Sequence, residues 1–203
     1  MNGTATRRIL QDATTDLVSL SCALLGDAEL ETFVDEASDS CVRSLESGQT
    51  IMIAGNGGSF ADSIHMAAEF TGRLLENRKA LPAIALGSNP SSLTAIGNDY
   101  GFTSVFRREF EAFATQDSTV IVFSTSGNSE NVIELLDAAR ERQVPAFGLL
   151  GNGGGKCLEL SRAFVVKSSS TARIQEIHMH IAHAICFAVE AKLGYPTGVR
   201  QND

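Results

Sequence analysis

Residues 50–73, which read TIMIAGNGGSFADSIHMAAEFTGR, constrain the fold of this chain more than any other stretch. They open with a short β-prone run, Thr50–Ala54, pass through a turn of small residues, Gly55–Ser59, and continue as an amphipathic helical pattern. Glycines let a backbone approach a ligand closely, and the N-terminus of the following helix offers free N–H groups. The order therefore predicts a strand, a phosphate-sized loop and a helix. A tight turn without a ligand is the alternative, because the loop lacks the GxGxxG and GK[ST] spacings of nucleotide-binding loops.

Three polar side chains, His65, Glu69 and Arg73, recur every four residues along the predicted helix. Each step of four turns the helix by only about 40° beyond a full turn, so the three groups share one stripe. An imidazole, a carboxylate and a guanidinium beside a glycine turn indicate the wall of an active site rather than a core face. His65 and Glu69 have the i, i+4 spacing of joint metal ligands, although exposed helices also carry such pairs by chance.

Short, nearly continuous apolar runs recur along the chain and have the character of buried parallel strands. Besides Thr50–Ala54, they are Pro82–Leu86, Thr119–Phe123, Pro145–Leu150 and Ala163–Lys167. Helical periodicity separates or follows them at about 102–113, 129–143 and 171–193. This alternation predicts an α/β fold, a three-layer doubly wound five-stranded parallel sheet whose ligands gather at the carboxyl ends of the strands.

Two amphipathic helices are expected before the first strand, at about 5–25 and 30–45. Because they precede the sheet, they are expected to form a helical layer or a subunit contact rather than sheet crossovers. We expect a single domain, 1–203. Within it, 5–48 form the N-terminal helical layer, 49–193 the α/β core, and 194–203 a tail without a periodic pattern.

Composition excludes several classes of protein. A formal net charge of −8 and a pI near 5.0 argue against a nucleic-acid-binding surface, although a local loop can still bind a small anion. Apolar runs fall short of the roughly 20 residues that cross a bilayer, and the first residues lack the apolar centre of a signal peptide, which predicts a cytoplasmic protein without a membrane partner. The four cysteines are scattered without a CxxC pair and are read as reduced, mostly buried thiols.

A second candidate loop, Ser124–Ser129, reads STSGNS and also lies between a predicted strand and a predicted helix. Its hydroxyls and backbone N–H groups can surround a phosphate at a helix N-terminus without a basic residue. Ser129 alone can serve as an ordinary helix N-cap. Since a cap needs only one such residue, the pattern favours a phosphate cradle.

Three of the four histidines fall within six residues of the last predicted helix, at His178, His180 and His183. They cannot all face one way, because helical neighbours two apart point to opposite sides. Periodicity alone leaves open which of them belongs to a site and which is structural.

The motifs AGNGGS, HMAAEFTGR, GNDYGF, STSGNS and RIQEIH, in this order, resemble those of the sugar isomerase (SIS) domain proteins. More narrowly, the chain resembles the phosphoheptose isomerase family, also called sedoheptulose 7-phosphate isomerases, over about Leu10–Ala191. The resemblance implies a homotetramer, a central five-stranded parallel sheet, N-terminal helices in the subunit contacts, and active sites near subunit boundaries with one Zn²⁺ each.

The resemblance also assigns roles to residues. It implies zinc ligation by His65, Glu69, Gln175 and His183. It makes Glu69 the catalytic base and His183 its acid/base partner. The substrate-binding set that it implies is Asn56, Gly57, Gly58, Ser59, Arg73, Asn98, Asp99, Ser124, Thr125, Ser126, Ser129 and Gln175. Within one helix Gln175 and His183 lie about 12 Å apart, so a metal site shared between chains is the easier geometry unless Gln175 precedes the helix.

The activity that the resemblance implies is the conversion of D-sedoheptulose 7-phosphate to D-glycero-D-manno-heptose 7-phosphate through an enediol, the first step of activated heptose biosynthesis. A non-catalytic SIS protein that binds the replication initiator is one alternative, but such relatives have lost the acidic residue and the late histidine that this chain retains. An isomerase of another ketose phosphate is the second alternative. Ala172, Phe60 and Ser92 depart from the family pattern, so the exact sugar stays open.

Overall fold

The computed structural model describes residues 2–196, so most of the expected tail, 197–203, lies outside the described residues. Five parallel strands form one sheet, as the sequence predicts, and the structure gives their order as β2-β1-β3-β4-β5. Their bounds are β1 Ile51–Gly55, β2 Ala83–Ala85, β3 Thr119–Ser124, β4 Ala146–Gly151 and β5 Arg162–Val166. The three middle strands are almost completely buried, which explains why their sequences are apolar runs rather than alternating patterns.

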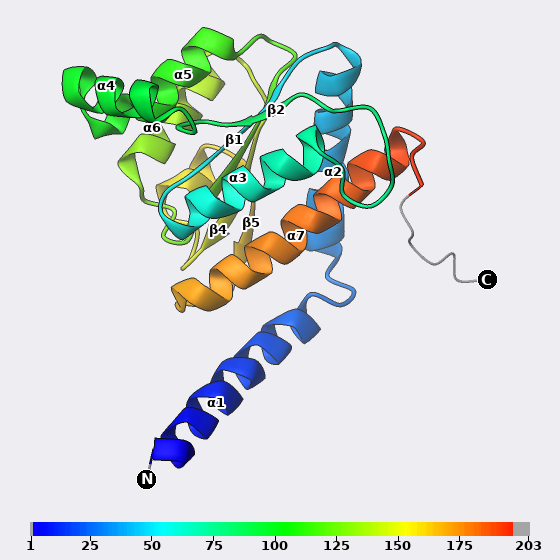
Figure 1. The fold of residues 1–203 in the computed structure, drawn as a ribbon, viewed down its shortest axis with the longest axis vertical. Helices are drawn as coiled ribbons and strands as arrows, with labels where there is room; N and C mark the ends of the chain where they lie inside the picture. Colours follow the sequence, from blue (N-terminus) through cyan, green and yellow to red (C-terminus); the bar gives the residue numbers. More distant parts are fainter. Residues whose placement is uncertain (1, 197–203) are drawn as a thin grey trace.

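Helices cover both faces of the sheet and give the expected three layers (Figure 1). One face packs against α2 (Ala28–Glu46), α3 (Gly58–Thr71) and α7 (Thr171–Lys192), and the other against α5 (Val105–Phe113) and α6 (Glu130–Glu141). Alternate residues of β1 enter the two cores: Ile51 and Ile53 join the first, and Met52 and Ala54 join the second. The fold is therefore a doubly wound α/β sandwich.

The strand order reverses between β1 and β3. From β1 the chain moves to β2 on one side, whereas β3 leads to β4 and β5 on the other. Loops that leave neighbouring strands in opposite directions open a crevice at the carboxyl edge of the sheet, where ligands of such folds bind. Both loops singled out in the sequence, Gly55–Ser59 and Ser124–Ser129, leave the sheet at this point.

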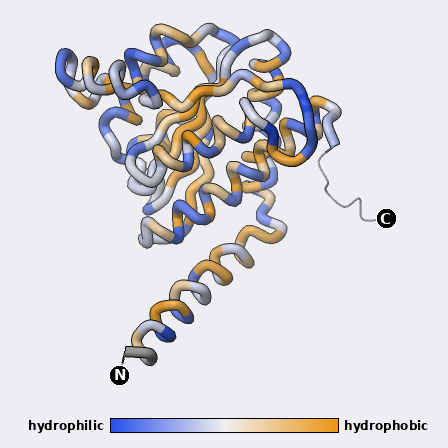
Figure 2. The backbone as a smooth tube through the Cα atoms, viewed as in Figure 1, coloured by the Kyte–Doolittle hydropathy of each residue, from blue (hydrophilic) through white to orange (hydrophobic). Residues whose placement is uncertain are grey.

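The first helix, α1 (Asn2–Ala23), projects from the body of the protein (Figure 1). Apolar residues recur along its length (Figure 2). Leu17 and Leu20 are partly buried against the first core, whereas Ile9 and Leu10 are 67% and 62% exposed. An isolated chain thus leaves an apolar stripe of α1 uncovered. Among residues 2–196, the helices are too short or too polar to span a membrane.

Hydrophobic periodicity does not predict one helix, α4 (Pro90–Tyr100), because none of its residues is buried. The local signals for it are nevertheless present: the Asn89 side chain accepts hydrogen bonds from the N–H groups of Ser91 and Ser92, and Pro90 occupies the first turn. The helix predicted at 102–113 begins instead with a short 3₁₀ turn, 102–104, before α5.

Candidate active site

The loop after β1 leads directly into the N-terminus of α3. Gly57 precedes the helix with φ +57°, and no side chain among the described residues caps this end, so its N–H groups are left for a ligand. Ser59 is buried in the first turn. The side-chain amide of Gln175 on α7 rests against Gly58, where a Cβ would lie 2.3 Å from Nε2 and would displace it.

The loop after β3 is held by its own side chains. The Ser124 hydroxyl accepts a hydrogen bond from the N–H of Gly127 at 3.0 Å, and the Ser126 hydroxyl accepts one from the N–H of Asn128 at 3.2 Å. Gly127 has φ +63°, and a Cβ there would lie 1.9 Å from the carbonyl oxygen of Gly154. Ser129 precedes α6 but makes no capping bond with its side chain to any described residue. Ser129 therefore occupies the N-cap position without its hydroxyl bonding an N–H group of α6, which leaves this hydroxyl available to a ligand.

A reciprocal amide pair joins the two loops. Asn56 Nδ2 donates to Asn131 Oδ1 at 2.8 Å, and Asn131 Nδ2 donates to Asn56 Oδ1 at 2.9 Å. Asn131 is buried in the first turn of α6. Sequence reasoning names Asn56 as a substrate contact and misses Asn131, because no local pattern reveals the partner of a buried amide. The pair fixes the spacing of the two loops across the crevice.

His65, Glu69 and His183 come together and are called the α3–α7 cluster below. His65 Nε2 lies 3.0 Å from Glu69 Oε1, and the His65 and His183 ring centroids are 5.1 Å apart. One potential ligand atom from each of the three residues lies within 4.8 Å of the others. The fold thus selects His183 among the late histidines, whereas His178 is buried and hydrogen-bonds the Leu150 carbonyl oxygen.

The electrostatics of the cluster favour a neutral imidazole at His183. Partial burial lowers its pKa, His65 and His180 add to that shift, and only Glu69 opposes it. Neutral imidazole is the form that binds a metal ion. Two imidazoles and one carboxylate fit a divalent cation such as Zn²⁺.

Asp62 is a further acidic group one turn before His65, and sequence reasoning misses it. Burial raises the pKa of its carboxyl to about 6, and His65 opposes this shift. Its Oδ2 atom is buried and has no hydrogen-bond partner among the described residues. The i, i+3 spacing from His65 is the sequence signal that places it on the same side of α3.

Gln175 lies within α7 and not before it, so it stands two turns, about 12 Å, from His183 on the same helix. Its side chain rests against Gly58, and Gly58 precedes His65 by about 10 Å along α3. One chain therefore brings His65, Glu69 and His183 together and leaves Gln175 beside the loop.

Three other residues of the expected set lie on exposed positions. Arg73 follows the end of α3, and Asn98 and Asp99 lie on α4, where Asn98 Nδ2 donates to Asp99 Oδ1 at 2.7 Å. Thr125 is half-buried in the loop after β3. The single chain thus presents these groups at its surface.

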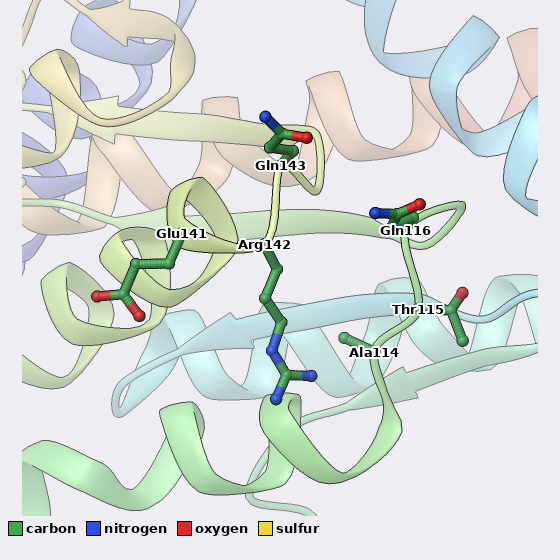
Figure 3. Close-up of a pocket in the computed structure, with 6 residues that line it drawn as sticks. All are labelled: Ala114, Thr115, Gln116, Glu141, Arg142 and Gln143. Carbon is green, nitrogen blue, oxygen red and sulfur yellow. The ribbon is translucent and has the colours of Figure 1, made fainter.

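A cavity of about 160 Å³ opens beside the first loop. Besides Gly55, Asn56 and Gly57, its lining consists mainly of apolar side chains, Phe60, Leu93, Phe102 and Phe106, with Gly87. A larger hollow, about 340 Å³, lies at the opposite, amino-terminal edge of β3 and β4 between residues 114–116 and 141–143 (Figure 3). That hollow is remote from the carboxyl edge of β1 and β3, where the strand order reverses. The crevice at that edge and the α3–α7 cluster are therefore the candidate site.

Loops at the point where the strand order of a doubly wound sheet reverses define an α/β protein with a ligand-binding crevice. The SIS domain family model matches residues 24–151. The phosphoheptose isomerase of a Nitratiruptor species is 47% identical over 163 residues, 80% of this chain and 87% of that protein. That of Pelobacter propionicus is 44% identical over 187 residues, 91% of this chain and 99% of that protein. The solved phosphoheptose isomerase of Neisseria gonorrhoeae has a TM-score of 0.82 at 35% identity, over 92% of this chain and 99% of that one. The chain belongs to the SIS domain family and, within it, to the phosphoheptose isomerases.

Proposed function

We propose that the protein isomerises D-sedoheptulose 7-phosphate to D-glycero-D-manno-heptose 7-phosphate, the first step of activated heptose biosynthesis. The observation that carries the proposal is the α3–α7 cluster, in which an imidazole–carboxylate pair and a second imidazole converge in a chain of this family. The presence of both Glu69 and His183 favours an enzyme over a non-catalytic relative that binds the replication initiator.

The phosphate is bound at the crevice. Ser59, Ser124, Ser126 and Ser129 supply hydroxyls, and the uncapped N-terminus of α3 supplies N–H groups and a partial positive charge. Binding an anion through neutral donors is consistent with the overall charge of −8. The remaining predicted contacts with the sugar are Asn56, Gly57, Gly58, Arg73, Asn98, Asp99, Thr125 and Gln175.

The reaction moves one proton between two carbons. Glu69 removes the proton from C1 of the ketose while the C2 oxygen gains a proton, which gives the enediol. Glu69 then returns a proton to C2 as the C1 oxygen loses its own, which leaves the aldose. His183 is the partner that transfers protons at oxygen or opens the ring.

His65, Glu69 and His183 are proposed to hold one Zn²⁺ per active site. When bound, the ion polarises the two sugar oxygens and stabilises the negative charge that develops on them. A carboxylate held firmly by a cation is a weaker base, so Glu69 would be the stronger base when it is not bound to the ion.

A homotetramer with sites between subunits is part of the proposal. Gln175 stands about two turns from His183 within one chain, so the Gln175 that completes a given metal site comes from a neighbouring subunit. The exposed apolar residues of α1, including Ile9 and Leu10, are suited to cover such a contact. Size-exclusion chromatography with light scattering tests this, and a monomer at micromolar concentration would contradict it.

The activity is tested by incubating the purified protein with ketose phosphates of five, six and seven carbons and following aldose formation by NMR. We expect sedoheptulose 7-phosphate to react fastest and a chelator to stop the reaction. Preference for a shorter sugar would support the alternative isomerase, because the departures at Ala172 and Phe60 leave the exact sugar open. No conversion of any sugar, with metal supplied, would overturn the proposed function.

A further inference from the structure

A buried ion pair lies behind the α3–α7 cluster. Arg78 Nε donates to Glu190 Oε1 at 2.5 Å, and the two side chains are only 1% and 2% exposed. Arg78 belongs to the segment between α3 and β2, whereas Glu190 lies near the end of α7. The pair therefore ties together the two helices that carry the cluster.

The same guanidinium caps the end of α3. Arg78 Nη2 donates to the carbonyl oxygen of Glu69 at 2.6 Å, and Nη1 donates to that of Phe70 at 2.8 Å. The last carbonyl groups of a helix lack intrahelical donors, and a left-handed glycine usually supplies the turn that satisfies them. Here the cap residue Gly72 has φ −88° and ψ −109°, outside that conformation. Arg78 thus supplies a donor to the Glu69 carbonyl oxygen, whereas the Phe70 carbonyl oxygen also accepts from the backbone N–H of Leu81 at 3.0 Å.

One of the capped carbonyl groups is that of Glu69, the proposed base. On α7, Glu190 follows His183 by two helical turns, and Cys186 lies between them. Burial raises the pKa of the Cys186 thiol well above its ordinary value, and Glu69 and Glu190 both contribute to the shift. Cys186 and the ion pair are therefore buried between the helices, next to the partly buried Glu69.

We propose that Arg78 and Glu190 form a positioning pair, which holds the end of α3 against α7 and so sets the distance between Glu69 and His183. This role rests on the proposed function. It explains why a charge pair is buried at this point although such pairs are poor stabilisers: the desolvation of two charges offsets most of their attraction. Because the guanidinium is a rigid fork with donors on three nitrogens, it fixes a carboxylate and two carbonyl groups at once.

The first test is the variant Arg78→Lys, which keeps the charge and loses the fork. We expect kcat to fall about 100-fold with KM almost unchanged, because a displacement of about 1 Å at a reacting group has this effect. We also expect the metal-free protein to bind Zn²⁺ roughly 10-fold to 100-fold more weakly by calorimetry, as for lost supports of metal ligands. Both effects follow from a shifted Glu69.

Lys192→Met is the matched control. Lys192 also lies at the end of α7, but it pairs with Asp35 and Asp39 of α2, at 2.6 Å each, and not with α3. We expect this variant to lower the melting temperature without changing kcat or Zn²⁺ affinity. If Arg78→Lys changes only the melting temperature, as this control is expected to, the pair is structural and the proposal is wrong.

The double variant Arg78→Met/Glu190→Leu distinguishes an effect on the position of Glu69 from an effect on the stability of the fold. Buried ion pairs are often replaced by apolar residues without loss of stability, so this protein is expected to fold even if Arg78→Lys does not. The carbonyl oxygen of Glu69 then lacks its donor, and we expect the same losses in kcat and Zn²⁺ affinity. A folded double variant with wild-type values would overturn the proposal. The zinc titration tests the pair even if the wild-type protein isomerises none of the sugars.

Discussion

The loop Ser124–Ser129 and the α3–α7 cluster make up two halves of one proposed site, yet they are built in different ways. The loop contains hydrogen bonds between residues two or three apart, such as the one from the Gly127 N–H to the Ser124 hydroxyl, and it also accepts bonds from the N–H groups of Lys156 and Cys157. The cluster joins residues of two helices that are distant in the sequence, and its geometry depends on how α3 and α7 pack. The hydroxyls proposed to bind the anion are thus neighbours in one short loop, whereas the groups for proton transfer come together only through the packing of two helices. Changes in the two regions should therefore separate binding from chemistry.

Glu69→Gln should have the largest effect. The amide keeps the size of the side chain but cannot act as a base, so we expect kcat to fall roughly 10³-fold to 10⁴-fold. Affinity for inorganic phosphate should stay unchanged, because the loop does not depend on the cluster. Turnover is measured by NMR, with proton exchange at C2 followed in D₂O, and phosphate binding by calorimetry. Glu31→Gln, an exposed acid of α2, is the control; unchanged turnover in Glu69→Gln would reject the assignment of the base.

Ser129→Ala should weaken substrate binding and leave the chemical step unchanged, the opposite of Glu69→Gln. Because this hydroxyl caps no N–H group of α6, its loss should leave stability unchanged. We expect KM for the sugar phosphate to rise roughly 10-fold to 100-fold, the effect of one hydrogen bond to a charged group, with kcat nearly constant. Ser170→Ala provides a matched control, since Ser170 also precedes a helix without a capping bond among the described residues. A fall in kcat alone would mean that Ser129 acts on the chemistry and not on the phosphate.

Asn131→Asp should have a smaller effect, because it acts on the loops only through Asn56. The carboxylate can still accept from Asn56 Nδ2, but it cannot donate to Asn56 Oδ1, and it adds negative charge near the proposed phosphate. We expect KM to rise about tenfold and the free energy of unfolding to fall by about 1–3 kcal/mol, the range for a buried unpaired acceptor. Steady-state kinetics and urea unfolding measure the two. A wild-type KM would show that the spacing of the loops does not govern phosphate binding.

The sequence predicts the features that depend on local signals and misses those that depend on contacts between distant segments. The five strands and both loops follow from apolar runs and small-residue turns, which are local signals. The partner of Asn56, the cap formed by Arg78 and the choice of His183 depend on contacts between distant segments, which periodicity does not contain. Helix α4 is not predicted, for another reason. None of its residues is buried, so it has no apolar periodicity, and the Asn89 cap is the main local signal for it.

The smallest expected effect concerns His178, which lies on the same helix as the cluster but belongs to the core. Burial lowers its pKa from the ordinary 6.5 to about 4, although the Leu150 carbonyl oxygen opposes the shift. Between these two pKa values the unfolded chain binds a proton at His178 that the folded protein does not. The free energy of unfolding is therefore unaffected by this group above pH 6.5 and decreases as the pH drops towards 4. From about pH 7 to about pH 5.5 we expect a loss of roughly 1 kcal/mol from this group.

Urea unfolding of the wild type and of His178→Gln at these two pH values isolates that contribution. Glutamine can still donate to Leu150 but does not titrate, so the wild type should lose roughly 1 kcal/mol more stability than the variant on acidification. The turnover of the two proteins should have the same pH profile, because His178 lies outside the α3–α7 cluster. Equal losses of stability would show that His178 is not the group that titrates. If the pH profile of turnover differs between the two proteins, His178 influences the α3–α7 cluster and is not only a core residue.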